Sequence, residues 1–179
     1  MVKHFIYLDE ISSSDLREIL NLAKKLKKEL KEKGRAFKKQ GELLEHKNVA
    51  MIFEKTSTRT RVSFDVGINH LGAHSIVMNK NDMQLAKGES AADTAKALSR
   101  YVDGIMIRAI SHDTIVDIAK YSDVPVINAL SDFSHPCQIL ASVMTIEEKL
   151  GDIKGKKLSW FGDEKTKLDV RSNSMLVNI

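Results

Sequence analysis

The stretch VAMIFEKTSTRTR (residues 49–61) joins an apolar run to a cluster of hydroxyl and guanidinium groups. Residues 49–53 are all apolar, which is typical of a short strand buried on both faces. A helix that begins within the polar cluster would present unpaired backbone N–H groups and the positive end of its dipole. The stretch therefore predicts a buried strand followed by an anion-binding helix start.

Several kinds of donor would converge on that anion. Ser57, Thr58 and Thr60 supply hydroxyls, and the planar fork of Arg59 can hold two oxygens at once. The alternative is that a hydroxyl merely caps the helix while the arginines pair with surface acids. The position directly after a strand favours the anion.

Short apolar runs alternate with amphipathic segments along the rest of the chain. Strands are predicted at residues 49–53, 74–78, 104–107, 126–130 and 157–161. Helices are predicted at residues 12–34, 57–71, 90–101, 111–121 and 136–150. Ser12 with Asp15 and Ser90 with Asp93 have the spacing of helix N-terminal caps. Strands separated by helices of this length predict an α/β fold, a parallel sheet flanked by helices.

Two units follow from this pattern. Residues 1–150 form a domain with its own core, and residues 151–179 begin a second α/β domain with the strand at 157–161. In a parallel sheet, ligands bind beyond the carboxyl ends of the strands. Three polar clusters, each of which follows a predicted strand, should therefore lie at one edge.

The other two clusters centre on Arg108 and His135. Arg108 closes an apolar strand, where its charge is costly unless it meets an anion or leaves the core. His135 opens a helix, with Gln138 a turn further on, and a neutral imidazole there can donate a hydrogen bond to a carbonyl oxygen. The alternatives are an exposed arginine at a strand end and a histidine that only caps the helix.

Together these groups would fix a phosphate and polarise a carbonyl attached to it, as acyl phosphate chemistry requires. That chemistry needs no metal, no cofactor and no covalent enzyme intermediate. Cys137 could be considered as a nucleophile, but no motif places a second histidine beside it, so we predict a packed thiol.

Composition limits the alternatives. The 179 residues are 42% hydrophobic and contain one cysteine. No apolar run approaches the roughly 20 residues of a membrane span, so we expect no membrane partner and a cytoplasmic location. The segment 24–39 holds nine of the 28 basic residues and two of the 24 acidic ones, on a helix with a regular apolar stripe. We interpret it as a solvated face, with nucleic-acid binding as a weaker alternative because no aromatics interleave with the lysines of the helix at 24–33.

Three motifs resemble the aspartate/ornithine carbamoyltransferase family: FEKTSTRTRVSF (residues 53–64), GIMIR (104–108) and HPCQ (135–138). HPCQ and MQLAKGES (83–90) are similar to the ornithine branch. The resemblance implies that Ser57, Thr58, Arg59 and Thr60 bind the phosphate of carbamoyl phosphate. It also implies that Arg108, His135 and Gln138 bind the carbamoyl group, with Arg108 and His135 catalytic, and that Gln84 reaches a neighbouring subunit in a homotrimer.

The implied reaction converts carbamoyl phosphate and L-ornithine to L-citrulline and phosphate in arginine biosynthesis. On this resemblance residues 1–150 are the carbamoyl-phosphate-binding domain and 151–179 a remnant of the ornithine-binding domain. We therefore expect an incomplete form that binds carbamoyl phosphate and turns over poorly alone. The alternatives are an aspartate carbamoyltransferase, or a non-catalytic truncated subunit that joins carbamoyltransferase trimers.

Overall fold

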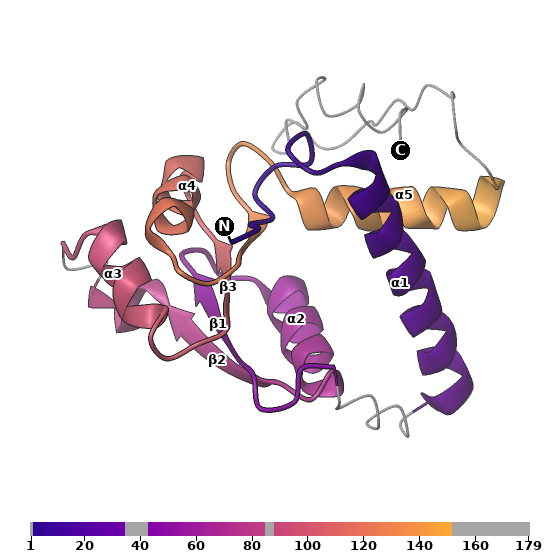
Figure 1. The fold of residues 1–179 in the computed structure, drawn as a ribbon, viewed down its shortest axis with the longest axis horizontal. Coiled ribbons are helices and arrows are strands. Elements are labelled where there is room, and N and C mark those ends of the chain that lie inside the picture. The colour runs from indigo at the N-terminus through magenta and orange to yellow at the C-terminus, as the bar shows by residue number, and fades with distance from the viewer. Residues whose placement is uncertain (1, 35–42, 85–87, 152–179) are drawn as a thin grey trace.

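Four parallel strands form the centre of the computed structural model, which describes residues 2–34, 43–84 and 88–151 (Figure 1). The strands are β1 (Asn48–Phe53), β2 (His74–Asn79), β3 (Gly104–Arg108) and β4 (Val126–Leu130). Their order in the sheet is β2-β1-β3-β4. The prediction of a parallel α/β sheet is confirmed, with each of these strands within one residue of its expected bounds. The strand predicted at 157–161 lies outside the described residues.

The predicted helices are also present. They are α1 (Ser13–Lys33), α2 (Thr58–His70), α3 (Ala91–Leu98), α4 (His112–Tyr121) and α5 (Pro136–Leu150), and a short 3-10 helix, η2 (Lys80–Asp82), was not expected. Ser12 and Ser90 cap α1 and α3 as predicted, each accepting a backbone N–H three residues later at 3.1 Å. Helix α3 ends three residues early, because the N–H of Tyr101 turns to the carbonyl of Leu98 at 2.9 Å.

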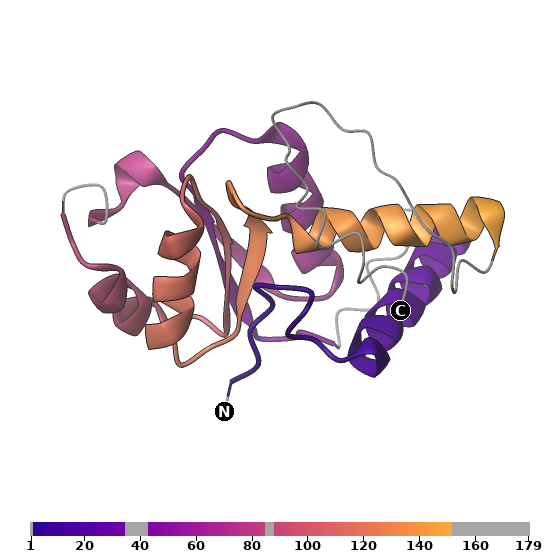
Figure 2. The same cartoon turned by 90° about the horizontal axis from the view of Figure 1, so that it is seen from above.

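Helices cover both faces of the sheet (Figures 1 and 2). Helices α3 and α4 lie on one side, and α2 and α5 lie on the other. Alternate residues of β1 serve the two sides, as a pleated strand requires. Ile52 is buried in the same cluster as Ile115 of α4, whereas Met51 and Phe53 are buried with Ile68 of α2. The uninterrupted apolar run of β1 is explained by this two-sided burial.

Helix α1 packs on α5, away from the sheet (Figure 2). Ion pairs line this contact: Glu147 meets Arg17 Nη1 and Lys24 Nζ, each at 2.6 Å, and Glu148 meets Lys27 Nζ at 2.6 Å. Glu147 is nearly buried, with 7% of its side chain exposed. Part of the basic segment is therefore engaged within the fold. Within the described ranges, no helix is both long and apolar enough to cross a bilayer.

The N-terminal segment covers the edge of the sheet at β4. Phe5 forms a parallel bridge with Ile127, its N–H donates to the carbonyl of Val126 at 2.8 Å, and its carbonyl accepts the N–H of Asn128 at 2.9 Å. No sequence pattern predicts this bridge, since a single residue has no periodicity. The contact ties the beginning of the chain to the strand that precedes His135.

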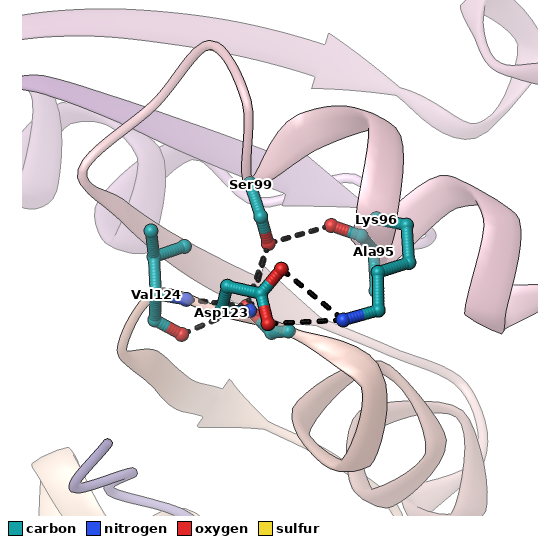
Figure 3. Close-up of polar contacts among 6 residues, drawn as sticks. Ala95, Lys96, Ser99, Asp123 and Val124 are labelled. Carbon is teal, nitrogen blue, oxygen red and sulfur yellow. Dashed lines mark hydrogen bonds and ion pairs between the residues drawn. The ribbon is translucent and has the colours of Figure 1, made fainter. Parts of the chain in front are cut away.

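A polar cluster joins α3 to the turn after α4 (Figure 3). Ser99 Oγ donates to the carbonyl of Ala95 at 2.7 Å and accepts the N–H of Asp123 at 3.0 Å. It also lies 3.2 Å from Ser122 Oγ. Lys96 Nζ holds both carboxylate oxygens of Asp123, at 2.9 and 3.1 Å. These bonds fix the two helices that cover one face of the sheet.

We expect Ser99→Ala to lower the free energy of unfolding by about 1–2 kcal/mol, because it removes two hydrogen bonds of a half-buried hydroxyl, to the carbonyl of Ala95 and from the N–H of Asp123. Urea unfolding followed by circular dichroism measures the change. Thr145→Ala is the matched control, since it removes one exposed bond to the preceding turn and should alter stability by less than about 0.5 kcal/mol. Equal losses in the two variants would contradict the structural role of Ser99.

Candidate functional site

The carboxyl ends of three strands are aligned at one edge of the sheet. Phe53 pairs with Arg108, and Arg108 pairs with Leu130. Two hydrogen bonds extend this alignment past the strands: Glu54 N to the Arg108 carbonyl at 2.9 Å, and Ala109 N to the Leu130 carbonyl at 3.0 Å. The three segments that follow these strands therefore start side by side, as the sequence predicted for the polar clusters.

Helix α2 is the next element after β1, and its N-terminus is suited to an anion. Ser57 is the N-cap residue, yet its side chain makes no capping hydrogen bond. The first turn holds no acidic residue and contains Arg59 and Arg61 instead. Positive side chains at the positive end of a helix are unfavourable unless an anion is present. Within the described residues neither arginine forms an ion pair, so the surface-pair alternative finds no support there.

Arg108 turns toward this helix start. Its side chain is half-buried, and Nη1 donates to Thr60 Oγ1 at 3.1 Å. Its Nε is buried and makes no hydrogen bond within the described part of the chain. Burial lowers the pKa of the guanidinium, which nevertheless stays charged at any physiological pH. The alternative of a freely exposed arginine at a strand end is therefore wrong.

His135 occupies the N-cap position of α5, with Pro136 as the first helical residue. Its side chain makes no capping bond, and the buried Nδ1 has no hydrogen-bond partner among the described residues. Burial, and then the positive charge of Arg108, lower the pKa of His135 from 6.5 to about 4. The imidazole is thus neutral at pH 7, with one nitrogen able to donate and the other able to accept. The alternative of a histidine satisfied by capping the helix finds no support among the described hydrogen bonds.

The remaining predicted residues lie around this pair. Ser57 is half-exposed, whereas Thr58 and Arg59 are exposed in the first turn of α2. Gln138 is exposed in the first turn of α5, and Gln84 is exposed beyond η2, past the edge strand β2. The structure thus brings Arg108 into contact with Thr60 and within electrostatic reach of His135. In the part of the chain that the structure describes, the side chains of Gln84 and Gln138 form no hydrogen bond with these three.

Sequence reasoning missed Glu54. This residue follows β1, and its Oε2 accepts the N–H of Ile110 at 2.6 Å, while its own N–H binds the carbonyl of Arg108. The two bonds enclose the turn that presents Arg108. A glutamate directly after a buried strand was the available signal, but its partner is a backbone group, which no side-chain motif reveals.

Sequence reasoning also missed three residues that fix the turn before His135, namely His112, Ser131 and Asp132. His112 Nδ1 lies 2.8 Å from Ser131 Oγ, and the backbone N–H of His112 donates to Asp132 Oδ1 at 2.7 Å. Ser131 Oγ also accepts backbone N–H groups from residues 133 and 134, at 3.2 and 3.1 Å. Burial lowers the pKa of His112, while the carboxylate of Asp132 acts in the opposite direction. Serine and aspartate are common in turns, so these residues gave little sequence signal.

Cys137 is a packed thiol, which confirms the prediction. Its Sγ donates to the carbonyl of Asn128 at 3.5 Å, and burial raises its pKa to about 11. A thiol of that pKa holds almost no thiolate at neutral pH, so it is a poor nucleophile.

Residues 3–148 match the family model described as "Aspartate/ornithine carbamoyltransferase, carbamoyl-P binding domain". The fold and the arrangement of polar groups at the sheet edge agree with this match. The chain belongs to the aspartate/ornithine carbamoyltransferase family, and the resemblance found in the three motifs is confirmed at that level.

Particular relatives are ornithine carbamoyltransferases. The enzyme of Brucella ovis is 52% identical over 162 residues, which are 90% of this chain and 50% of the relative. The solved structure from Pyrococcus furiosus is 51% identical with a TM-score of 0.77, covering 86% of this chain and 47% of the other. That from Burkholderia thailandensis is 41% identical with a TM-score of 0.82, covering 91% and 55%. The chain thus spans about half the length of the curated relatives it matches.

We expect the imidazole of His135 to titrate near pH 4, because burial and Arg108 both oppose its protonation. NMR of the histidine rings, assigned with His135→Gln, measures this pKa. Between pH 6.5 and 4 the unfolded chain binds the proton more readily, so this group makes stability fall as the pH is lowered through that window.

Urea unfolding should therefore show a shallower loss of stability from pH 6.5 to 4 in His135→Gln than in the unmodified chain. Gln138→Ala is the control from the same helical turn and should retain the original slope. A His135 pKa near 6.5 would contradict the burial of the ring near the charge of Arg108.

Proposed function

We propose that this chain binds carbamoyl phosphate at the carboxyl ends of β1, β3 and β4, as part of an ornithine carbamoyltransferase. The observation that supports the proposal is the contact of Arg108 Nη1 with Thr60 Oγ1 beside a helix start rich in donors. Two buried nitrogens of the same site, Arg108 Nε and His135 Nδ1, have no partner among the described residues. Buried polar groups are ordinarily paired, so these two are suited to hydrogen bonds with a substrate.

The phosphate end would lie at the N-terminus of α2. The backbone N–H groups of the first turn, the hydroxyls of Ser57, Thr58 and Thr60 and the guanidinium of Arg59 would hold its oxygens. The helix dipole and the guanidinium groups of Arg59 and Arg108 favour a doubly charged anion over a neutral ligand. This assignment accounts for a first turn without acidic residues.

The carbamoyl end would lie between Arg108 and His135, with Gln138 near the first turn of α5. As ornithine's uncharged side-chain amine attacks the carbamoyl carbon, negative charge develops on the carbonyl oxygen. Donors from Arg108 and the neutral His135 would stabilise that charge, and a single such donor is worth roughly 3 kcal/mol of barrier. The C–O bond to phosphate then breaks and its electron pair leaves with the phosphate. The departing phosphate takes up the proton that the attacking nitrogen loses, which gives citrulline and hydrogen phosphate.

Ornithine as the second substrate rests on the HPCQ motif and on the ornithine carbamoyltransferases among the relatives. Aspartate is the alternative within the same family, whose model covers both. We further propose that Gln84 completes the site of a neighbouring subunit in a homotrimer. Gln84 is exposed beyond the edge strand β2, and among the described residues its side chain forms no hydrogen bond with Thr60, Arg108 or His135. A non-catalytic subunit that joins such trimers remains the alternative role.

We expect isothermal titration calorimetry to show binding of carbamoyl phosphate, and Arg59→Ala to weaken it about tenfold or more, since a hydrogen bond to a charged group contributes about 1.5–3 kcal/mol. Arg61→Ala is the matched control, a second exposed arginine in the same turn, and should change the affinity much less. Equal losses would indicate diffuse attraction by positive charge. No binding by the unmodified chain would overturn the proposal.

We expect this chain alone to form citrulline at no more than a trace rate, because the described site provides donors for carbamoyl phosphate while proximity of the amine supplies much of the rate. Citrulline and carbamoyl aspartate are measured in parallel with each amino acid offered at equal concentration. Rapid citrulline formation would contradict the expectation that ornithine is held by residues beyond those described. Carbamoyl aspartate as the sole product would favour the aspartate alternative.

A further inference from the structure

Asn128 is a polar residue in the middle of β4, and its side chain is completely buried. The strands around it contribute aliphatic side chains to the core, so a carboxamide here has a cost unless each of its polar atoms is paired. A buried amide that is fully paired restricts its neighbours to a single arrangement. Its partners therefore show what the residue holds in place.

The carboxamide joins three backbone segments. Nδ2 donates to the carbonyl of Ile6 at 3.2 Å and to Ser134 Oγ at 3.2 Å, and Oδ1 accepts the N–H of Leu130 at 2.9 Å. Donor and acceptor functions are thus both used. Only a group with donors on one side and an acceptor on the other can make all three bonds. An aspartate carboxylate of similar size has no donor, and a leucine side chain has neither donor nor acceptor.

The backbone of Asn128 adds two more contacts. Its N–H donates to the carbonyl of Phe5, and its carbonyl accepts the thiol of Cys137 at 3.5 Å. Cys137 belongs to the first turn of α5, two residues after His135. Asn128 therefore contacts the sequence on both sides of His135, through Ser134 before it and Cys137 after it.

The backbone conformation of Leu130 explains why the hydrogen bond from Asn128 is needed. Its φ is +149°, a value that residues other than glycine rarely adopt. Unfavourable backbone conformations persist only where surrounding bonds enforce them. Here the N–H of Leu130 binds Asn128 Oδ1 and its carbonyl accepts the N–H of Ala109, the residue after Arg108. This unusual conformation turns the chain from β4 toward His135 while linking it to the Arg108 strand.

We propose that Asn128 is a positioning residue that sets the imidazole of His135 against Arg108 for carbamoyl phosphate. The inference rests on the proposed function for the ligand, whereas the placement of His135 can be measured without any ligand. Asn128 itself touches no substrate in this proposal. It acts through the turn at residues 130–134, and a displacement of His135 by about 1 Å is enough to reduce a site's effectiveness severalfold to a hundredfold.

The test compares Asn128→Ser with Ser122→Ala, a control that removes another buried hydrogen-bonding side chain, far from His135 in the turn after α4. Both should lower stability in urea. Only Asn128→Ser should raise the pKa of His135 from about 4 toward 6.5 in NMR titrations and weaken carbamoyl phosphate binding about tenfold. If both variants lose stability while His135 titrates as in the unmodified chain, the residue is merely structural and the proposal fails.

Two further variants keep the proposal testable if Asn128→Ser does not fold. Ser134→Ala removes one partner of the carboxamide at a half-exposed position and should shift the pKa of His135 in the same direction, by less. Leu130→Gly relieves the cost of its backbone conformation and should partly restore the affinity of Asn128→Ser, or of Ser134→Ala in its place. No shift in Ser134→Ala together with no restoration would overturn the proposal.

The two hypotheses fail in different ways. An unmodified chain that does not bind carbamoyl phosphate would refute the proposed function, while the pKa comparison would still decide the role of Asn128. Binding that is intact in the unmodified chain and unchanged in Asn128→Ser would refute only the positioning role.

Discussion

The parallel alignment of β1, β3 and β4 is the constraint on which the candidate site depends. Parallel strands end at a common edge, and here their last residues form one row, Phe53, Arg108 and Leu130. Backbone hydrogen bonds continue the alignment one residue further, through Glu54 and Ala109. Because the row is held by backbone geometry, the polar segments that follow are placed near one another whatever their distance along the chain.

Electrostatics gives that edge its chemical character. A helix N-terminus and three arginines lie together there, and the nearby histidine is neutral because its surroundings oppose another positive charge. Such an arrangement is less stable than one with acids in the first turn of α2. Functional sites commonly retain this kind of local destabilisation, and an anion bound at this edge would relieve it.

The rest of the domain supports the site from both sides of the sheet. Glu54 encloses the Arg108 turn, while His112, Ser131 and Asp132 brace the turn that leads to His135. Asn128 connects that second turn to the N-terminal segment at the sheet edge. The basic helix α1 has a different role in the described structure, since Lys24 and Lys27 pair with glutamates of α5. Its positive charge is therefore partly used within the fold, which weakens the argument for nucleic acid.

The sequence by itself determined the strands, the helices, their caps and the three polar clusters. Each of these is a local matter of apolar periodicity, capping residues or a break in the pattern, and Ser12, Ser90 and the run at 49–53 show it most clearly. The three motifs also indicated the family that the match over residues 3–148 shows.

Only the tertiary structure decided how those clusters meet. The contact of Arg108 with Thr60, the low pKa of His135 and the hydrogen bonds of Glu54 and Asn128 join residues that are far apart in the chain or involve backbone groups. The early end of α3 and the bridge made by Phe5 depended on it as well. Burial and hydrogen-bond partners arise from packing, so no pattern within one segment specifies them.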